Sequence, residues 1–128
     1  MNEDERSALN ETTRKIIGAA YEVANNLGCG FLEKVYENAL AHELGQIGLC
    51  FEQQKSVSVL YRGKVVGVYT TDLLVNKTVV VELKAVKALD EIHQAQCLNY
   101  LKATGQQVCL LLNFGSPKLQ IRRLVLDF

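Results

Sequence analysis

The sequence predicts an α/β fold in which a mixed β-sheet is flanked by helices, with the element order αα-βββ-α-ββ. Two long segments with apolar residues at three- and four-residue steps come first, and three segments rich in β-branched residues follow. A further helical segment separates these strands from two more. Because a helix that crosses between strands of one sheet joins parallel neighbours, the sheet should contain at least one parallel pair.

The first two elements are predicted to be helices. Apolar residues recur at helical spacing over about residues 9–27, and Gly28-Cys29-Gly30 ends this helix. The second helix covers about residues 31–46 and ends before Gly48. Its apolar stripe is predicted to consist of Leu32, Val35, Tyr36, Ala39, Leu40 and Leu44.

Three strands follow, over about residues 52–61, 64–75 and 78–85, with a turn at Arg62-Gly63. A third helix over about residues 90–104 is stopped by Gly105.

The last two strands cover about residues 107–113, which are apolar, and about residues 118–126. The third helix is polar in its middle, with Gln96 and Asn99 between apolar residues. A helix that packs on a sheet and yet carries amides in that region is a candidate for a functional element.

The 128 residues are predicted to form one domain over residues 1–128, since hydrophobic residues make up 48% and charged residues 22%, as in ordinary globular proteins. No apolar run approaches the length of a membrane span, and the acidic, polar start does not resemble a secretory signal. The four cysteines form no Cys-x-x-Cys pair, so neither zinc nor redox chemistry is expected. We therefore predict a cytoplasmic protein in which Cys97 and Cys109 are reduced core residues.

The formal net charge is zero. Nucleic-acid-binding proteins usually carry a basic excess, so this value argues mildly against tight non-specific binding by the monomer. It leaves room for a local basic patch, because the lysines and arginines could cluster in the fold.

Asp72, Glu82 and Lys84 are the most informative residues. Side chains alternate along a strand, so Glu82 and Lys84 point to the same face of a strand that is otherwise apolar on both faces. Buried charge is costly unless it is paired or binds a metal. Either the three residues form structural ion pairs, or the two carboxylates bind Mg²⁺ or Mn²⁺ while the lysine acts on an attacking water or on a phosphate.

The turn between the second and third strands decides whether Asp72 and Glu82 can share an ion. A two-residue turn at Asn76-Lys77 would place Asp72 opposite Val81 and facing away from Glu82. A shared ion needs a three-residue loop of Asn76, Lys77 and Thr78, a five-residue loop, or a β-bulge near Asp72.

Three further residues could carry chemistry, although each also has a simpler interpretation. Glu33 borders the stripe of the second helix, but a glutamate in a first turn is also favoured by the helix dipole. Gln96 and Tyr100 lie four residues apart and so share one face of the third helix, where they are either a partly buried polar pair or groups that orient a carboxylate, water or phosphate. His93 has no partner motif, and Asn113-Phe114-Gly115 is most simply a turn that ends a strand.

Taken together, these residues resemble the PD-(D/E)XK nuclease superfamily. Asp72 followed by Glu82-Leu83-Lys84 matches its D-x(n)-E-x-K pattern, which is weak by itself. The segment from Gly30 through Glu33 to Tyr36 resembles the motif of the GxxExxY family within this superfamily. Gln96 and Tyr100 match that family's QxxxY pair, and Asn113-Phe114-Gly115 fits as well, so four motifs occur in the same order.

This resemblance implies a restriction-endonuclease-like core and a single PD-(D/E)XK nuclease-like domain. It implies that Asp72 and Glu82 are metal ligands, that Lys84 is the catalytic lysine, and that Glu33 is an additional metal-side carboxylate. Gln96 and Tyr100 would be catalytic groups on the substrate side or in support of it. The chain departs from the family at Thr70-Thr71, where Arg-Ala is common and a positive charge is lost, and at Gly28-Cys29-Gly30, where Gly-Pro-Gly is common.

Three functions are therefore compared. The leading one is a Mg²⁺- or Mn²⁺-dependent hydrolase that cleaves phosphodiester bonds of DNA or RNA. The second is a non-catalytic module that binds nucleic acid or protein and retains the nuclease fold. The third is a subunit of a larger defence or repair assembly. Nucleic acid is the expected partner, a second copy of the chain or a partner protein is compatible with the sequence, and no membrane is expected.

Overall fold

A computed structural model describes residues 1–126, so residues 127 and 128 of the predicted domain lie outside the described part. The order αα-βββ-α-ββ is confirmed. The elements are α1 (Glu3–Leu27), α2 (Glu33–Gln46), β1 (Phe51–Tyr61), β2 (Lys64–Val75), β3 (Val79–Lys84), α3 (Glu91–Thr104), β4 (Val108–Asn113) and β5 (Gln120–Val125). None of the helices within residues 1–126 combines the length and the apolar character needed to cross a membrane.

The five strands form one mixed sheet in the order β1-β2-β3-β4-β5. Only the β3–β4 pair is parallel, and α3 is the crossover between these two strands, as predicted. The strands β3 and β4 are almost entirely buried because helices cover both faces of the sheet's centre.

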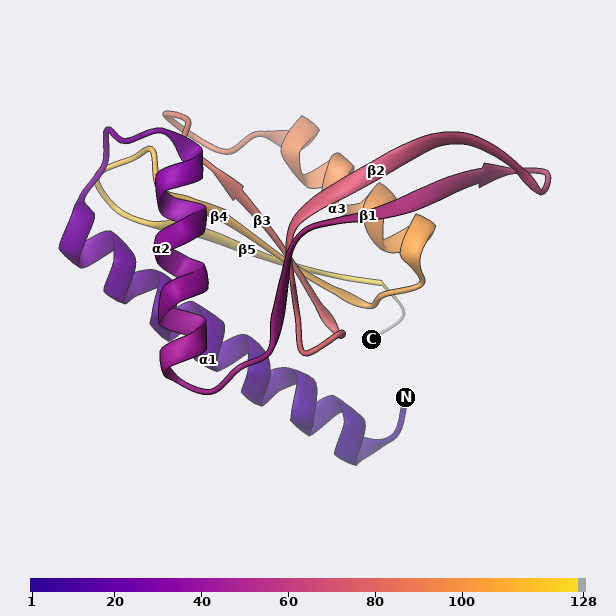
Figure 1. Ribbon diagram of the computed structural model, residues 1–128, viewed down its shortest axis with the longest axis horizontal. Coiled ribbons are helices and arrows are strands. Elements are labelled where there is room, and N and C mark those ends of the chain that lie inside the picture. The colour runs from indigo at the N-terminus through magenta and orange to yellow at the C-terminus, as the bar shows by residue number, and fades with distance from the viewer. Residues whose placement is uncertain (127–128) are drawn as a thin grey trace.

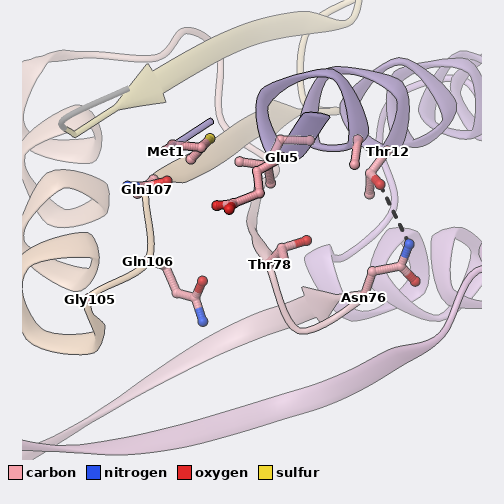
Figure 2. A pocket seen from close by; sticks show the side chains of 10 residues that line it. Met1, Glu5, Thr12, Asn76, Thr78, Gly105, Gln106 and Gln107 are labelled. Carbon is pink, nitrogen blue, oxygen red and sulfur yellow. Dashed lines mark hydrogen bonds between the residues drawn. The ribbon is translucent and has the colours of Figure 1, made fainter. Parts of the chain in front are cut away.

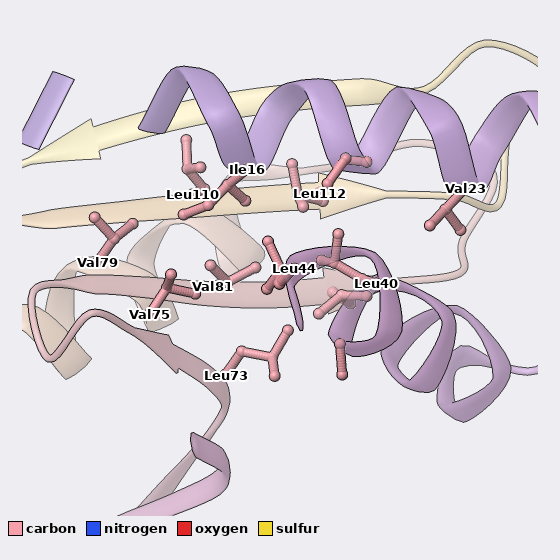
Figure 3. Packing of buried hydrophobic residues seen from close by; sticks show 14 of the residues in the cluster. Ile16, Val23, Leu40, Leu44, Leu73, Val75, Val79, Val81, Leu110 and Leu112 are labelled. Carbon is pink, nitrogen blue, oxygen red and sulfur yellow. The ribbon is translucent and has the colours of Figure 1, made fainter. Parts of the chain in front are cut away.

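Helices α1 and α2 lie on one side of the sheet and α3 on the other (Figure 1), and each side has its own hydrophobic core. On one face, α1 and α2 pack against the odd-numbered residues of β3, and Figure 3 shows Ile16, Leu40 and Leu44 over Val79 and Val81. On the other face, α3 packs with Tyr100 and Leu101 against the even-numbered residues, such as Val80. The alternation predicted for β3 is thus correct, and it places Glu82 and Lys84 toward the α3 side.

Two sequence predictions about the helices are wrong in detail. Helix α1 begins at Glu3 rather than near Leu9, because the Asn2 side chain caps it by accepting a hydrogen bond from the Glu5 amide at 2.8 Å. The stripe of α2 is rotated: Leu32 is 80% exposed, whereas Glu37 is buried. This rotation matters because it turns a carboxylate inward.

The β1–β2 ribbon extends beyond the rest of the sheet (Figure 1). We call residues 55–71 the hairpin arm. Leu74 and Tyr69 both pack into the α3-side core although residues five apart on a regular strand point to opposite faces. The ribbon therefore turns over between them, where Gln54 of β1 has the positive φ of 53°. The arm leaves large apolar side chains in solvent: Leu60, Tyr61, Val65, Val66 and Val68 are each at least 61% exposed.

The chain directly after β3 is held by Asn113 and Gly115. The Asn113 side chain is buried, accepts from the Val86 amide at 3.0 Å and donates to the Val86 carbonyl at 2.9 Å. A Cβ at Gly115 would overlap the backbone of Ala85 and Val86. The Asn113-Phe114-Gly115 segment is therefore a clamp that fixes the end of β3 as well as a turn.

Replacing Gly115 by alanine should destabilise the protein by about 1–3 kcal/mol or more, because the added methyl group meets backbone that cannot move without disturbing β3. Gly18→Ala is the matched control. No atom lies within 4 Å of a Cβ at this helical position, so that change should stabilise the protein by about 0.5–1 kcal/mol. Urea unfolding of both variants measures the difference, and equal effects would contradict the clamp.

Candidate functional site

The site lies where β2 separates from β3. The last paired residues are Leu73 and Val81. One step further, the Asp72 Oδ2 atom accepts a hydrogen bond from the Leu83 amide at 2.8 Å. The buried Thr71 hydroxyl lies 3.2 Å from the Val81 carbonyl oxygen and donates to it. Side chains of β2 thus replace the backbone ladder as the strands diverge.

The observed register brings the two carboxylates to the same side of the sheet. Val75 pairs with Val79, so Asn76, Lys77 and Thr78 form a three-residue loop, which is one of the connections that a shared ion requires. Asn76 and Lys77 have positive φ angles of 52° and 59°. In this register the next opposing positions are Asp72 and Glu82.

A cavity of about 410 Å³ opens at this point. It is lined by Glu33, Val68, Tyr69, Thr70, Asp72, Glu82, Lys84 and Gln96. These residues come from α2, β2, β3 and α3. Five of the six predicted site residues therefore meet in one cavity, and Tyr100 does not line it.

The surroundings of Glu82 disfavour its charged carboxylate unless a cation is bound beside it. Its Oε1 atom is buried and has no hydrogen-bond partner among residues 1–126. Burial, and next the neighbouring Asp72 carboxylate, raise the pKa of Glu82 to about 8. Burial also raises the pKa of Asp72, although the Leu83 amide and the Gln54 amide counteract it. Partial burial, followed by the charge of Asp72, raises the pKa of Glu33. Like charges are thus crowded together.

Lys84 is half-buried beside these carboxylates. Within residues 1–126 it forms no ion pair with any carboxylate. The alternative of a structural Asp72–Lys84 or Glu82–Lys84 pair therefore finds no support in the geometry. The ammonium group remains available to a ligand of the cavity.

Tyr100 supports the cavity from behind. Its ring packs edge-on against Tyr69 with centroids 5.0 Å apart, and its hydroxyl donates to the Lys55 carbonyl at 3.4 Å. The Tyr69 hydroxyl in turn donates to the Gln96 carbonyl at 3.1 Å. Burial, and next the charge of Glu82, raise the pKa of each tyrosine to about 12. Both stay protonated and fix the hairpin arm against α3.

Tyr36 positions the start of α2. Its hydroxyl donates to the Gly28 carbonyl at 2.6 Å and accepts from the Phe31 amide at 3.1 Å. Its buried ring stacks on Phe114 with centroids 4.8 Å apart. The loop before α2 is thus tied to the clamp after β4, and Glu33, the first residue of α2, is delivered to the cavity rim.

Comparison with known proteins agrees with this arrangement. A family model described as the PD-(D/E)XK nuclease superfamily matches residues 10–124. The chain belongs to the PD-(D/E)XK nuclease superfamily. A search of curated protein sequences found no match.

Among solved structures, this PD-(D/E)XK chain is similar to one titled "Crystal structure of SSO0001", with a TM-score of 0.55 and 16% sequence identity. The alignment covers 75% of this chain and 51% of that chain, so the chain spans about half the length of this neighbour. At this identity the likeness concerns the fold, a restriction-endonuclease-like mixed sheet flanked by helices.

PD-(D/E)XK nucleases generally use divalent metal ions, and the residues present fit one in part. The unpartnered Oε1 atom of Glu82, beside Asp72, offers the hard oxygen donors that Mg²⁺ and Mn²⁺ prefer. No group of three or more His, Cys, Asp or Glu side chains in the described residues is placed to hold an ion as it stands. Asp72 and Glu82 fit as a two-carboxylate set, and the role of Glu33 stays a prediction.

Glu37 is a buried carboxylate, linked to Asp72 through Gln54, that the sequence analysis missed. It is buried, and it accepts from Lys34 Nζ at 3.0 Å, Gln53 Nε2 at 2.8 Å and Gln54 Nε2 at 2.9 Å. The Gln54 amide also lies 3.3 Å from Asp72 Oδ1 and donates to it. A polar chain thus runs from α2 through β1 to Asp72. The adjacent glutamines and the four-residue spacing from Glu33 to Glu37 were the signals that could have revealed it.

A second cavity, of about 380 Å³, lies at the other end of β3 (Figure 2). Asn76 and Gln106 line it, but their amides already contact Thr12 at 3.5 Å and the Lys77 carbonyl at 3.2 Å. Among the described residues that line it, Glu5 is the one with an ionisable side chain. This cavity offers no set of groups that points to catalysis.

The crowded carboxylates predict the pH dependence of the metal-free protein. In the unfolded chain Glu82 loses its proton near its ordinary pKa of 4.5, whereas the folded chain keeps that proton to about pH 8. The folded state binds more protons between these values, so the free energy of unfolding should fall as pH rises through this window, by up to about 1.4 kcal/mol per pH unit.

Urea unfolding in the presence of a chelator, from pH 5 to pH 8, measures this slope. Glu82→Gln should flatten the curve because it removes the titrating group. Glu22→Gln, an exposed change on α1, should leave the slope as it is in the wild type. A wild-type curve that rises with pH over this window would contradict the strained carboxylate.

Proposed function

We propose that this chain is a nuclease that requires Mg²⁺ or Mn²⁺ and hydrolyses phosphodiester bonds of DNA or RNA. The observation that carries the proposal is that Asp72 and Glu82 oppose each other where β2 leaves β3, with a buried Glu82 oxygen that has no hydrogen-bond partner in the described part of the chain. A structural role would pair such an atom, since an unsatisfied buried carboxylate oxygen is costly.

Asp72 and Glu82 would hold the ion. When bound, a divalent cation withdraws electrons from a phosphate oxygen and lowers the pKa of a coordinated water. Asp72 is oriented by the Leu83 and Gln54 amides, which leave part of its oxygen capacity for a further partner.

The remaining residues have distinct proposed roles. Lys84 faces the cavity without an ion-pair partner in the described chain, so it is suited to orient the attacking water and to neutralise charge on the pentavalent phosphorus. Glu33 at the rim supplies a third carboxylate on the metal side. The Gln96 amide is suited to bind a substrate oxygen. Tyr100 is a positioning residue that acts through Tyr69.

We also propose that the chain belongs to the GxxExxY group within the superfamily. Two structural features explain why this motif has a glycine and a tyrosine at these positions. Gly30 has a positive φ of 113°, which a residue with a side chain rarely adopts, and Tyr36 ties the preceding loop to the start of α2. The motif thereby places Glu33 at the rim. The four free cysteines are in keeping with the cytoplasm as the site of action.

A binding module without catalysis, or a subunit of a larger defence or repair assembly, is the second candidate. The observation that favours it is the net charge of zero, which gives the chain little overall attraction for a polyanion. Such a module has no need for two carboxylates that share one side of the sheet, so cleavage activity separates the two candidates.

The direct test is cleavage of single- and double-stranded DNA and RNA with Mg²⁺ or Mn²⁺. We expect cleavage that a chelator abolishes. Glu82→Gln and Lys84→Met should each lower the rate by about 100-fold or more, as when a charge-stabilising catalytic group is lost. Lys87→Met, an exposed lysine outside the cavity, is the control. A rate that is equal in Lys84→Met and Lys87→Met would refute the proposed role of Lys84.

Metal binding should also be visible as stability. An ion that binds only the folded chain stabilises it by about 2.7 kcal/mol at a hundredfold excess over Kd. Mg²⁺ or Mn²⁺ should therefore raise the Tm of the wild type. Asp72→Asn should lose this response, yet without metal it should melt no lower than the wild type, because a charge that burial disfavours is removed and the amide oxygen can still accept from Leu83.

Differential scanning calorimetry of both proteins with and without metal measures these effects. A structural Asp72 predicts the opposite pattern, in which metal has no effect on the wild type and Asp72→Asn is clearly destabilised. That pattern would end the metal-site proposal.

A further inference from the structure

A groove between the hairpin arm and α3 continues the site cavity. It has a volume of about 610 Å³ and is lined by Ser58, Val59, Leu60, Tyr69, Asn99, Lys102 and Ala103. Tyr69 lines both this groove and the site cavity. The two hollows are therefore neighbours that share Tyr69 as a common wall.

One face of α3 borders both hollows. Gln96 lines the site cavity, and Asn99 and Ala103 line the groove, at the three- and four-residue steps of a single helix face. Lys102 adds an exposed ammonium group at the groove. On the opposite side, the arm contributes the Ser58 hydroxyl and the apolar Leu60 side chain.

The hairpin arm has a strong charge bias. Residues 55–71 contain three basic residues, Lys55, Arg62 and Lys64, and no Asp or Glu, although Lys55 forms an ion pair with Glu52, just before the arm, at 3.1 Å. This bias favours a polyanion and disfavours symmetric pairing of two arms, which would bring like charges together. Five of its apolar side chains (Leu60, Tyr61, Val65, Val66 and Val68) are more than half exposed and offer apolar contact surface beside this charge.

We propose that the groove binds an unpaired strand of nucleic acid that leads away from the phosphate held in the site cavity. Lys102 would contact a backbone phosphate, and Asn99 and Ser58 would bind sugar or base edges. Leu60, Val59 and Ala103 would contact the flat faces of bases. This inference rests on the proposed function, whose substrate class it narrows to single strands or to duplexes with an unpaired end.

The size of the groove supports an unpaired strand. Its volume lies within the range of about 300–1,000 Å³ that is usual for small-molecule pockets, which suits one or two nucleotides. In a duplex the faces of the bases are stacked on one another and their edges are paired, so the faces cannot reach Leu60 or Ala103. A free single strand presents both its phosphates and its bases to the groove.

The test measures binding separately from cleavage. Fluorescein-labelled single-stranded DNA and RNA oligonucleotides, and the same DNA as a blunt duplex, are titrated with the full chain carrying Glu82→Gln, in chelator. Fluorescence anisotropy gives Kd as a function of salt. Two groove variants, Lys102→Gln and Leu60→Glu, are compared in this background with two controls outside the groove.

The controls match the charge changes. Lys15→Gln removes an exposed lysine of α1, and Val66→Glu adds the same charge as Leu60→Glu to an equally exposed position of the arm that does not line the groove. Leu60 is 62% exposed and Val66 61%, so neither change should unfold the protein, and circular dichroism checks this.

We expect single strands to bind more tightly than the duplex. Lys102→Gln and Leu60→Glu should raise the Kd for single strands about 3- to 10-fold, and Lys102→Gln should reduce the salt slope by about 0.7, the value for one phosphate contact on a single strand. Both controls should lie within about twofold of the parent. If these effects appear but the wild type cleaves no substrate, the proposed binding of single strands in the groove is supported and the nuclease proposal is refuted.

Four outcomes would overturn the proposal that the groove binds an unpaired strand. If the groove variants bind oligonucleotides as their controls do while the wild type still cleaves, the groove proposal is refuted and the nuclease proposal is not affected. Tighter binding of the blunt duplex, or no oligonucleotide binding at all, would also remove it. A Leu60→Glu change that halves the mass of the protein in solution without weakening oligonucleotide binding would assign the arm to a second copy of the chain instead.

Discussion

The hydrogen bond from the Leu83 amide to the Asp72 carboxylate, 2.8 Å long, is the contact on which the site depends. It replaces a backbone contact at the position where β2 leaves β3. Without a substitute acceptor, the separation would leave a buried N–H group unpaired, which is costly. The same bond fixes Asp72 in place. The free edge of β2, the cavity beside Glu82 and the projecting hairpin arm all follow from this separation.

The surroundings of the carboxylates explain how the fold tolerates them. Burial raises the pKa of both Asp72 and Glu82, so the charged site opposes folding when no cation is present. Two apolar cores, packed on both faces of β3, supply the offsetting stability. The Tyr36–Phe114 stack and the Asn113 clamp fix the start of α2 and the end of β3, the two elements that carry Glu33 and Glu82.

The sequence predicted the order of elements and the parallel β3–β4 pair because apolar periodicity and glycine stops are local signals. The sequence left the pairing register of β2 and β3 open. The three-residue loop depends on positive φ angles at both Asn76 and Lys77, and the sequence contains no turn motif that predicts them. It missed Glu37, whose burial depends on glutamines of β1 that lie 16 and 17 residues away. It grouped Tyr100 with the cavity residues because helix spacing predicts a shared face but not how deep each side chain lies; the Tyr100 ring packs against Tyr69, which lines the cavity.

The net charge of zero does not argue against nucleic-acid binding when the distribution of the charges over the chain is considered. Residues 1–50 carry eight acidic and four basic side chains, and residues 51–128 carry six and ten. Much of the acidic excess therefore belongs to α1 and α2, while the hairpin arm carries basic residues alone. Charges separated by more than about 10 Å are largely screened at 0.1 M salt, so a strand lying on the arm responds to the arm's charge rather than to the sum over the chain. A neutral chain can thus present a locally basic arm next to a cavity lined by carboxylates, and the arm is the part whose charge favours the proposed binding of a polyanion.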